Sequence, residues 1–179
     1  KEDGSVITWG SSYYGTESSD AVGLTGVSQI FSTSSAFAAL KDDGSVVTWG
    51  DDRFGADSSA VASSLSSGVN QIFSTERAFA ALKDDGSVFT WGESMYGGDS
   101  SAIAASLTSG VKKIFSTSAA FAALKDDGSV ITWGSSYYGG DSSAVASYLT
   151  SGVKNIFSNS YAFAALKDDG SVITWGSSY

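Results

Sequence analysis

The side chains of this chain that could take part in a reaction are carboxylates, because the sequence contains neither histidine nor cysteine. This composition excludes histidine-based triads, thiolate nucleophiles and cysteine zinc sites built from this chain alone. A glycoside hydrolase would need two acids about 5 to 10 Å apart. The acids available on the variable loops defined below are Asp51, Asp52, Glu76 and Glu93. Solvated loop acids are the ordinary explanation for such residues, so we predict no enzyme and no cofactor.

Most of the remaining acidity is a repeated feature. Ten of the 19 acids belong to five copies of a Lys-acid-Asp-Gly segment, such as 125–128. One such segment supplies too few oxygens for calcium and lacks the twelve-residue loop pattern of calcium-binding hands, so we predict turns and no metal site. The formal net charge of −9 disfavours nucleic acid, since binding a phosphate backbone requires clustered cations. No apolar run is long enough to span a membrane as a helix.

An internal repeat organises the whole chain. Alignment on the recurring tryptophans gives spacings of 40, 42, 42 and 42 residues. A period in this range is typical of propellers and solenoids, whose neighbouring units bury a shared core. We therefore predict one array over residues 1–179. Its units begin near Lys1, Lys41, Lys83, Lys125 and Lys167, and the last is partial. The tryptophans, to which we assign a structural role, are Trp9, Trp49, Trp91, Trp133 and Trp175.

The unit at 111–152 illustrates the expected elements. Short apolar segments at Val111–Ser116 and Ala120–Leu124 predict two strands, and the β-branched segment Ser129–Trp133 predicts a third. The Asp-Gly between the second and third segments indicates a hairpin, because glycine tolerates the positive φ of tight turns. Paired alanines in the second segment would let neighbouring sheets approach closely.

The last piece of the unit, Asp141–Gly152, has a different pattern. It begins with residues that favour helix N-caps and ends in a glycine. We predict a short helix, with an outer fourth strand as the alternative. The residues expected on its apolar face are Ala144, Val145, Tyr148 and Leu149.

Comparison of the units with one another indicates where a partner would bind. The loop between the first two strands and the residues after each Trp-Gly vary most. In an antiparallel meander both stretches emerge at one end, opposite the acidic turns. They carry Tyr, Met and Arg, which are common in interfaces. The candidate partner-binding residues are Tyr13, Arg53, Glu76, Arg77, Met95, Tyr137 and Tyr161. The constant rings beside them, which we expect to pack under their own units, are Tyr14, Phe54, Tyr96 and Tyr138.

The order of an apolar strand, Phe-Ala-Ala-Leu, Lys-Asp-Asp-Gly-Ser-Val, Ile-Thr-Trp-Gly and Tyr-Gly resembles the regulator of chromosome condensation repeat. That family forms β-propellers, commonly with seven blades. The compact units with a Ser-Gly-Val lead are similar to bacterial members such as the propeller-type β-lactamase inhibitory protein. The resemblance implies an all-β, propeller-like fold and carries no ligand with it. Eukaryotic members often have a histidine before the second strand, where this chain has Ala36, Ala78, Ala120 and Ala162.

The two ends of the sequence predict how the array closes. Residues 1–13 and 167–179 differ only at Glu2 and Asp168, and a closed four-bladed ring would have no place for that duplicate. We therefore expect an open arc or part of a larger propeller. We expect a non-enzymatic module that binds a protein or a glycan, or that assembles with further copies or repeats, as part of an extracellular or cell-surface protein. A structural repeat of a fibre or layer is the alternative, and a carboxylate-based glycoside hydrolase is a remote one.

Overall fold

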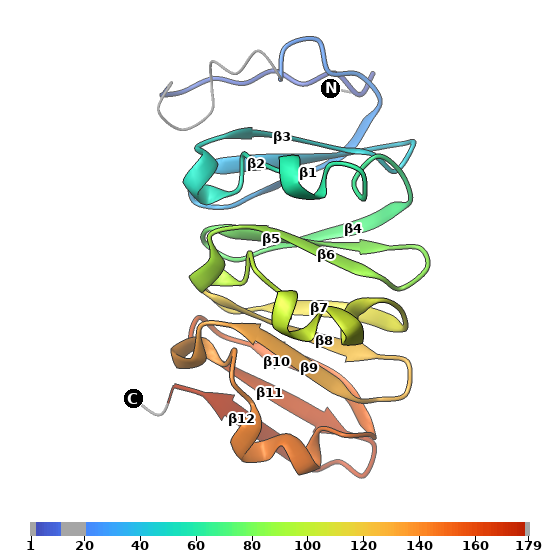
Figure 1. Cartoon of the computed structure of the whole chain (residues 1–179), viewed down its shortest axis with the longest axis vertical. Helices are drawn as coiled ribbons and strands as arrows, with labels where there is room; N and C mark the ends of the chain where they lie inside the picture. Colours follow the sequence, from blue (N-terminus) through green and yellow to red (C-terminus); the bar gives the residue numbers. More distant parts are fainter. Residues whose placement is uncertain (1–2, 12–20, 178–179) are drawn as a thin grey trace.

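The computed structural model describes residues 3–11 and 21–177. Four three-stranded antiparallel sheets, here called blades, follow one another along the chain and stack into a column (Figure 1). Each blade is a meander, because its strands pair in sequence order. Blade 1 contains β1 (Val27–Ser32), β2 (Ala36–Lys41) and β3 (Val46–Gly50), blade 2 contains β4 (Val69–Ser74), β5 (Ala78–Lys83) and β6 (Val88–Gly92), blade 3 contains β7 (Val111–Ser116), β8 (Ala120–Lys125) and β9 (Val130–Gly134), and blade 4 contains β10 (Val153–Ser158), β11 (Ala162–Lys167) and β12 (Val172–Gly176).

The predicted strands are confirmed, with ends that differ by no more than one residue in the unit at 111–152. The blades do not begin at the lysines at which the predicted sequence units begin. A blade starts at the Gly-Val lead, so the lysine falls at the end of its second strand, as Lys125 does in β8.

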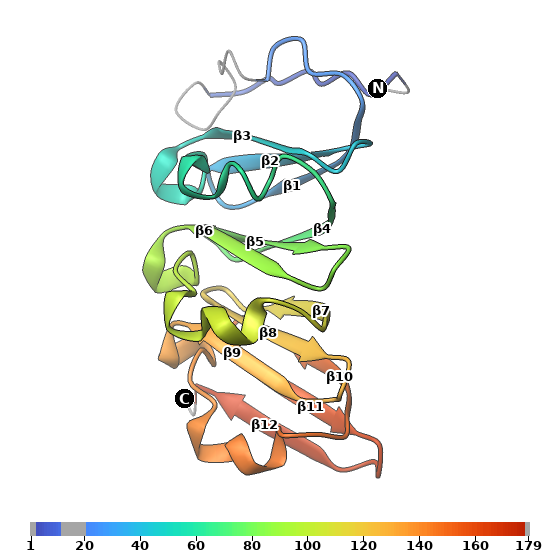
Figure 2. The ribbon, with the colours of Figure 1, turned by 45° about the vertical axis from the view of Figure 1, so that its right-hand side comes forward.

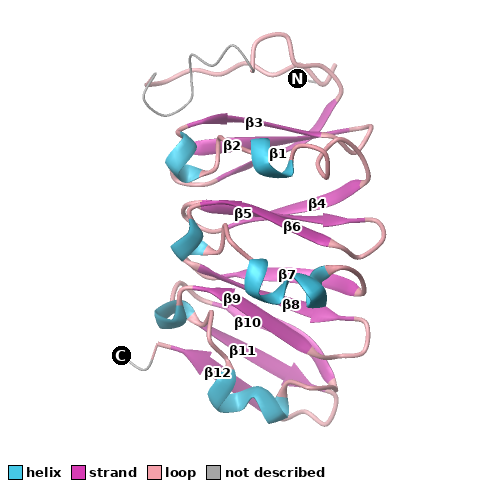
Figure 3. Ribbon diagram, in the orientation of Figure 1, coloured by secondary structure: helices cyan, strands magenta, loops and turns pink. Residues whose placement is uncertain are grey.

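Short 3-10 helices connect the blades (Figure 3). The predicted helix is confirmed as a helical segment, but its expected face is wrong. Leu149 is buried and Val145 is half-buried, whereas Ala144 and Tyr148 are exposed. The segment winds with three residues per turn, so the 3.6-residue spacing used for the prediction does not apply. The helices that follow each third strand are η2 (Asp52–Phe54), η4 (Ser94–Tyr96) and η6 (Ser136–Tyr138), and those that lead to the next blade are η3 (Ser59–Val61), η5 (Ser101–Leu107) and η7 (Ser143–Tyr148).

The core lies between the blades. Alternate residues of each second strand face opposite neighbours, so Ala122 contributes to the cluster shared with blade 4 and Ala123 to the cluster shared with blade 2. Both alanines are fully buried. Their small side chains let the sheets approach, as the sequence predicts.

A buried aromatic pair fixes each of these clusters. Trp133 stacks on Phe121 with ring centroids 5.3 Å apart, and its indole Nε1 donates to the carbonyl of Gly97 in the preceding unit at 3.1 Å. The tryptophans of blades 1 to 4 are at most 7% exposed. Trp9 differs from them and is 84% exposed, because none of the described strands lies before it to cover its ring.

The Lys-Asp-Asp-Gly turns hold successive units together. In blade 3, Asp127 Oδ1 accepts hydrogen bonds from the Ser129 N–H at 2.9 Å and hydroxyl at 2.6 Å, and these bonds lower the pKa of Asp127. The carbonyl of Gly128 accepts from the N–H of Val153, the first residue of the next blade, at 3.0 Å. These turns are structural, as the sequence predicts.

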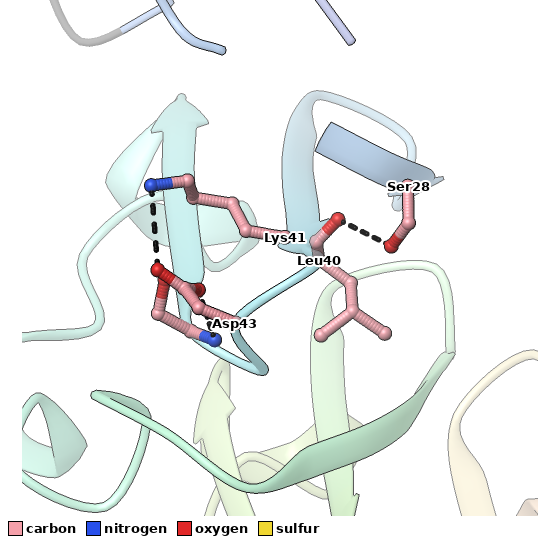
Figure 4. A network of polar contacts seen from close by, with 5 residues as sticks. Ser28, Leu40, Lys41 and Asp43 are labelled. Atoms are coloured by element: carbon pink, nitrogen blue, oxygen red, sulfur yellow. Dashed lines mark hydrogen bonds and ion pairs between the residues drawn. The ribbon is translucent and has the colours of Figure 1, made fainter. Parts of the chain in front are cut away.

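The copy of the turn at 41–44 is also fixed by local polar contacts. Figure 4 shows Lys41 Nζ beside the Asp43 carboxylate, at 3.7 Å. It also shows the Ser28 hydroxyl donating to the carbonyl of Leu40, at 3.0 Å. Ser28 lies at the register shift between β1 and β2, so its side chain satisfies a carbonyl at that irregularity.

Residues 3–11 lie at one end of the column and blade 4 at the other, in both views of the ribbon (Figures 1 and 2). The described chain is therefore an open stack, as predicted. Among the described residues, no helix is long and apolar enough to cross a membrane.

Candidate functional site

The two variable stretches of each unit meet at one end of the blades. The N–H of Asp51, after β3, donates to the carbonyl of Ser35 in the β1–β2 loop at 2.9 Å. The Thr33 hydroxyl donates to the carbonyl of Phe54 at 2.9 Å. We call this end the loop face, and the Lys-Asp-Asp-Gly end the turn face. The described loop face comprises residues 33–35, 51–54, 75–77, 93–96, 117–119, 135–138 and 159–161.

A polar groove of about 520 Å³ crosses the loop face at the ends of the first strands. Its lining is almost entirely hydroxyl-bearing, and Glu76 is the charged residue within it. The lining residues are Ser32, Thr33, Ser34, Ser74, Thr75, Glu76, Ser116, Thr117, Ser118, Ser158, Asn159 and Ser160.

Backbone hydrogen bonds tie the groove together from blade to blade. The N–H of Ser34 donates to the carbonyl of Glu76 at 2.9 Å, the N–H of Glu76 to Ser118 at 2.9 Å, and the N–H of Ser118 to Ser160 at 3.0 Å. Threonine hydroxyls such as that of Thr117, which donates to the Tyr138 carbonyl at 2.9 Å, fix the neighbouring loop. The groove is therefore a preformed surface.

A column of stacked side chains runs beside the groove. The guanidinium carbon of Arg77 lies 4.7 Å from the ring centroid of Phe54 and 5.0 Å from that of Tyr96. Tyr161 stacks on Tyr138 at 5.4 Å. Ala119, which is buried, holds the corresponding position in blade 3.

The constant rings are half-buried. Phe54, Tyr96 and Tyr138 each pack against the cluster between two blades, which agrees with the structural role expected for them. Tyr13 and Tyr14 lie outside the described residues.

The residue before each constant ring points away from the core. Met95 and Tyr137 are 71% and 76% exposed. Arg53 is also exposed, and it forms a two-pronged ion pair with Asp51, through Nε at 3.1 Å and Nη2 at 2.7 Å. This pairing lowers the pKa of Asp51 and raises that of Arg53.

The structure thus places the candidate residues that it describes, Arg53 included, on the loop face. Glu76 lines the groove, Arg77 and Tyr161 adjoin it, and Met95 and Tyr137 extend the same surface. The hydroxyl-lined groove itself is not among the predicted sites. Its signal in the sequence is the polar run, such as Ser-Thr-Ser at 116–118, that follows the first strand of every unit.

In the described ranges, no group of three His, Cys, Asp or Glu residues is placed to hold a metal ion. Asp51 is engaged by Arg53.

Arg77 is predicted to stabilise the stack through its two rings. Substitution R77A should lower the free energy of unfolding by about 1 kcal/mol, because a cation over an aromatic face contributes about 0.5 to 2 kcal/mol. Chemical denaturation followed by circular dichroism measures this change. The matched control is R53A, whose exposed ion pair should contribute clearly less to stability than the contacts of Arg77 do. Equal losses for the two variants would contradict the prediction.

Three solved structures are similar to this chain. Yeast RCC1 (Prp20), bound to Kap60, has a TM-score of 0.55 and 19% identity, covering 84% of this chain and 42% of that one. The ectodomain of the Physcomitrella patens receptor kinase CR4 has a TM-score of 0.53 and 19% identity, covering 86% of this chain and 39% of that one. Human WBSCR16 has a TM-score of 0.50 and 23% identity, covering 84% of this chain and 47% of that one.

These similarities show an RCC1-like β-propeller fold, in agreement with the predicted fold class. The chain spans less than half the length of each of these three proteins. No family model matches the sequence, and no curated protein matches it. The predicted likeness to bacterial members of the repeat family stays a prediction.

Proposed function

We propose that this chain is a non-enzymatic module that binds another protein through its loop face. The observation that carries the proposal is the row of exposed large side chains, Met95, Tyr137 and Tyr161, beside the rigid groove. Exposed aromatic and methionine side chains that gather at one place are typical of interaction surfaces. Hydroxyl groups in the groove can donate to and accept from a polypeptide backbone.

The rigidity of this face favours binding. The backbone hydrogen bonds between the loops and the packed column of Arg77 and the rings order the surface before a partner arrives. A preordered surface loses less conformational entropy on association, so more of the contact energy contributes to affinity. The similar yeast protein is bound to Kap60 in its crystal structure, which supports a protein as the partner class.

We further propose an extracellular or cell-surface setting. The acidity, the absence of cysteine and the richness in serine and glycine of this chain support it. The similarity of the fold to a receptor-kinase ectodomain adds support. A nucleic-acid partner is not proposed, because the net charge is −9.

Selection from a library of displayed random peptides tests the proposal. Peptides selected on the wild-type chain should bind the variant M95A/Y137A/Y161A at least about tenfold more weakly, because interface aromatics commonly contribute 1 to 2 kcal/mol or more. Binding is measured by surface plasmon resonance. The matched control is D42N/D126N/D168N on the turn face, which should bind within about twofold of wild type.

Two outcomes would contradict the proposal. One is that the selected peptides bind the loop-face variant as tightly as wild type. The other is that no peptide is selected while an array of glycans gives binding that the loop-face variant loses, which would assign the face to a glycan.

A further inference from the structure

Blade 4 exposes the same face that every other blade buries. In blade 3 the residues of this face are covered by blade 4, whereas in blade 4 Ala162, Ala164 and Leu166 are only half-buried. Phe157 and Val172, beside them, are 56% and 58% exposed. The covered counterparts in blade 3 are Ala120, Ala122, Leu124, Phe115 and Val130.

Blade 1 exposes part of the complementary face, although Ala39 and Trp49 on that face are buried. Ile30 is 48% exposed, whereas its counterpart Ile72 in blade 2 is 1% exposed. Phe37 is half-buried, whereas Phe79 is fully buried. An apolar pocket of about 230 Å³ lies at this end. Its lining is Val6, Ile7, Thr8, Trp9, Ile30, Phe37 and Trp49.

Residues 3–10 pack against blade 1 in the way that the third strand of each blade packs against the blade that follows it. The N–H of Val27 donates to the carbonyl of Gly4 at 3.2 Å, just as the N–H of Val69 donates to Gly44 at 3.0 Å. Val6 packs against the cluster of blade 1, as Val46 packs against that of blade 2. Residues 6–10 are nevertheless in none of the described sheets.

The sequence of residues 5–11 occurs again at the other end of the chain, where it forms the third strand of a complete blade. Residues 5–11 and 171–177 have the same sequence, Ser-Val-Ile-Thr-Trp-Gly-Ser. The second segment contains β12, which pairs with β11, and there Trp175 is buried on Phe163. The first segment leaves Trp9 84% exposed. Residues 6–10 can therefore make with β11 every contact that β12 makes.

We propose that two copies of this chain join head to tail by strand replacement. Residues 6–10 of one copy pair with β11 of the other in place of β12, and blade 1 of the first copy stacks on blade 4 of the second. The pairing of Ala164 with Thr174 becomes a pairing of Ala164 with Thr8 of the other copy. The inference concerns the ends of the column and is independent of the loop-face proposal.

The physical balance favours the joined form at high concentration. Replacing β12 by an identical sequence exchanges equal hydrogen bonds and equal apolar contacts, so that step is close to neutral. Stacking then buries Ile30 and Phe37 against Ala164 and Leu166, as each interface inside the column does. It also brings the Ser160 N–H, which has no partner among the described residues, to the Ser34 carbonyl, continuing the bonds between loops.

Single cysteines introduced into this cysteine-free chain test the register. T8C and A164C proteins are mixed and oxidised, and the disulfide is located by mass spectrometry of proteolytic peptides. Directly opposite residues of antiparallel strands have Cα atoms about 4.5 to 5.5 Å apart, within disulfide range. The mixture should give a dimer linked between positions 8 and 164, at least about tenfold more abundant than the dimer from V6C and A164C, which are two residues out of register.

An internal control and a second measurement complete the test. The double variant A164C/T174C should form its disulfide within one chain, which establishes that this register allows the bond. Native mass spectrometry of the wild-type chain should show dimers and longer chains that increase with concentration, and I30E or L166E should reduce them by about tenfold. A wild-type chain that stays monomeric, or a T8C and A164C mixture no better linked than the out-of-register pair, would overturn the proposal.

Discussion

Substitution W133A is expected to lower the free energy of unfolding by about 3 to 5 kcal/mol, which is the usual range for truncating a buried tryptophan. Trp133 is 5% exposed, stacks on Phe121 and donates its indole N–H to Gly97. The substitution removes the ring from the core between blades 2 and 3 and leaves a carbonyl without its donor. Both effects weaken the same interface, and blades 2 and 3 contribute much of the core of the chain.

Urea denaturation followed by far-ultraviolet circular dichroism measures the loss. The matched control is W9A, in the same Ile-Thr-Trp-Gly sequence. Because Trp9 is 84% exposed, this substitution should change the free energy of unfolding by less than about 0.5 kcal/mol in dilute protein. If W9A were as destabilising as W133A, residues 5–10 would be packed much as the internal third strands are.

The exposed Trp9 and the buried tryptophans show what the sequence can and cannot predict. The period of 42 residues and the Asp-Gly turns predict the strands and their meander, because both depend on short-range patterns. Burial depends on neighbouring blades. Trp9 and Trp175 have identical flanking residues, yet one is exposed and the other is buried.

Part of the candidate site could likewise be predicted from the sequence, and part of it could not. Variation among the units predicts the loop face, because loops after the first and third strands of a meander must emerge together. The position of Arg77 between the rings of Phe54 and Tyr96 could not be predicted from the sequence. It joins a residue that follows blade 1 to two residues of blade 2, and only the stacking distance between blades places them in contact. The groove likewise exists because four serine- and threonine-rich loops lie side by side.

The turn face offers a second test of the contact between blades, through two glycines in the same turn sequence. Gly128 has φ +76° and Gly170 has φ +83°, so alanine at either position is forced into the left-handed region at a cost of about 1 to 2 kcal/mol. A Cβ on Gly128 would lie 2.7 Å from the backbone nitrogen of Gly152, whereas a Cβ on Gly170 would meet nothing within 4 Å.

Substitution G128A should therefore lower the free energy of unfolding by about 2 to 5 kcal/mol, since overpacking adds about 1 to 3 kcal/mol to the backbone term. Substitution G170A should show the backbone term alone. The difference between the two urea denaturation curves isolates the contact of the turn with the next blade. Equal losses would mean that blade 4 does not hold the Gly152 backbone against Gly128, and that the blades are packed less closely than the 3.0 Å bond from Val153 to Gly128 requires.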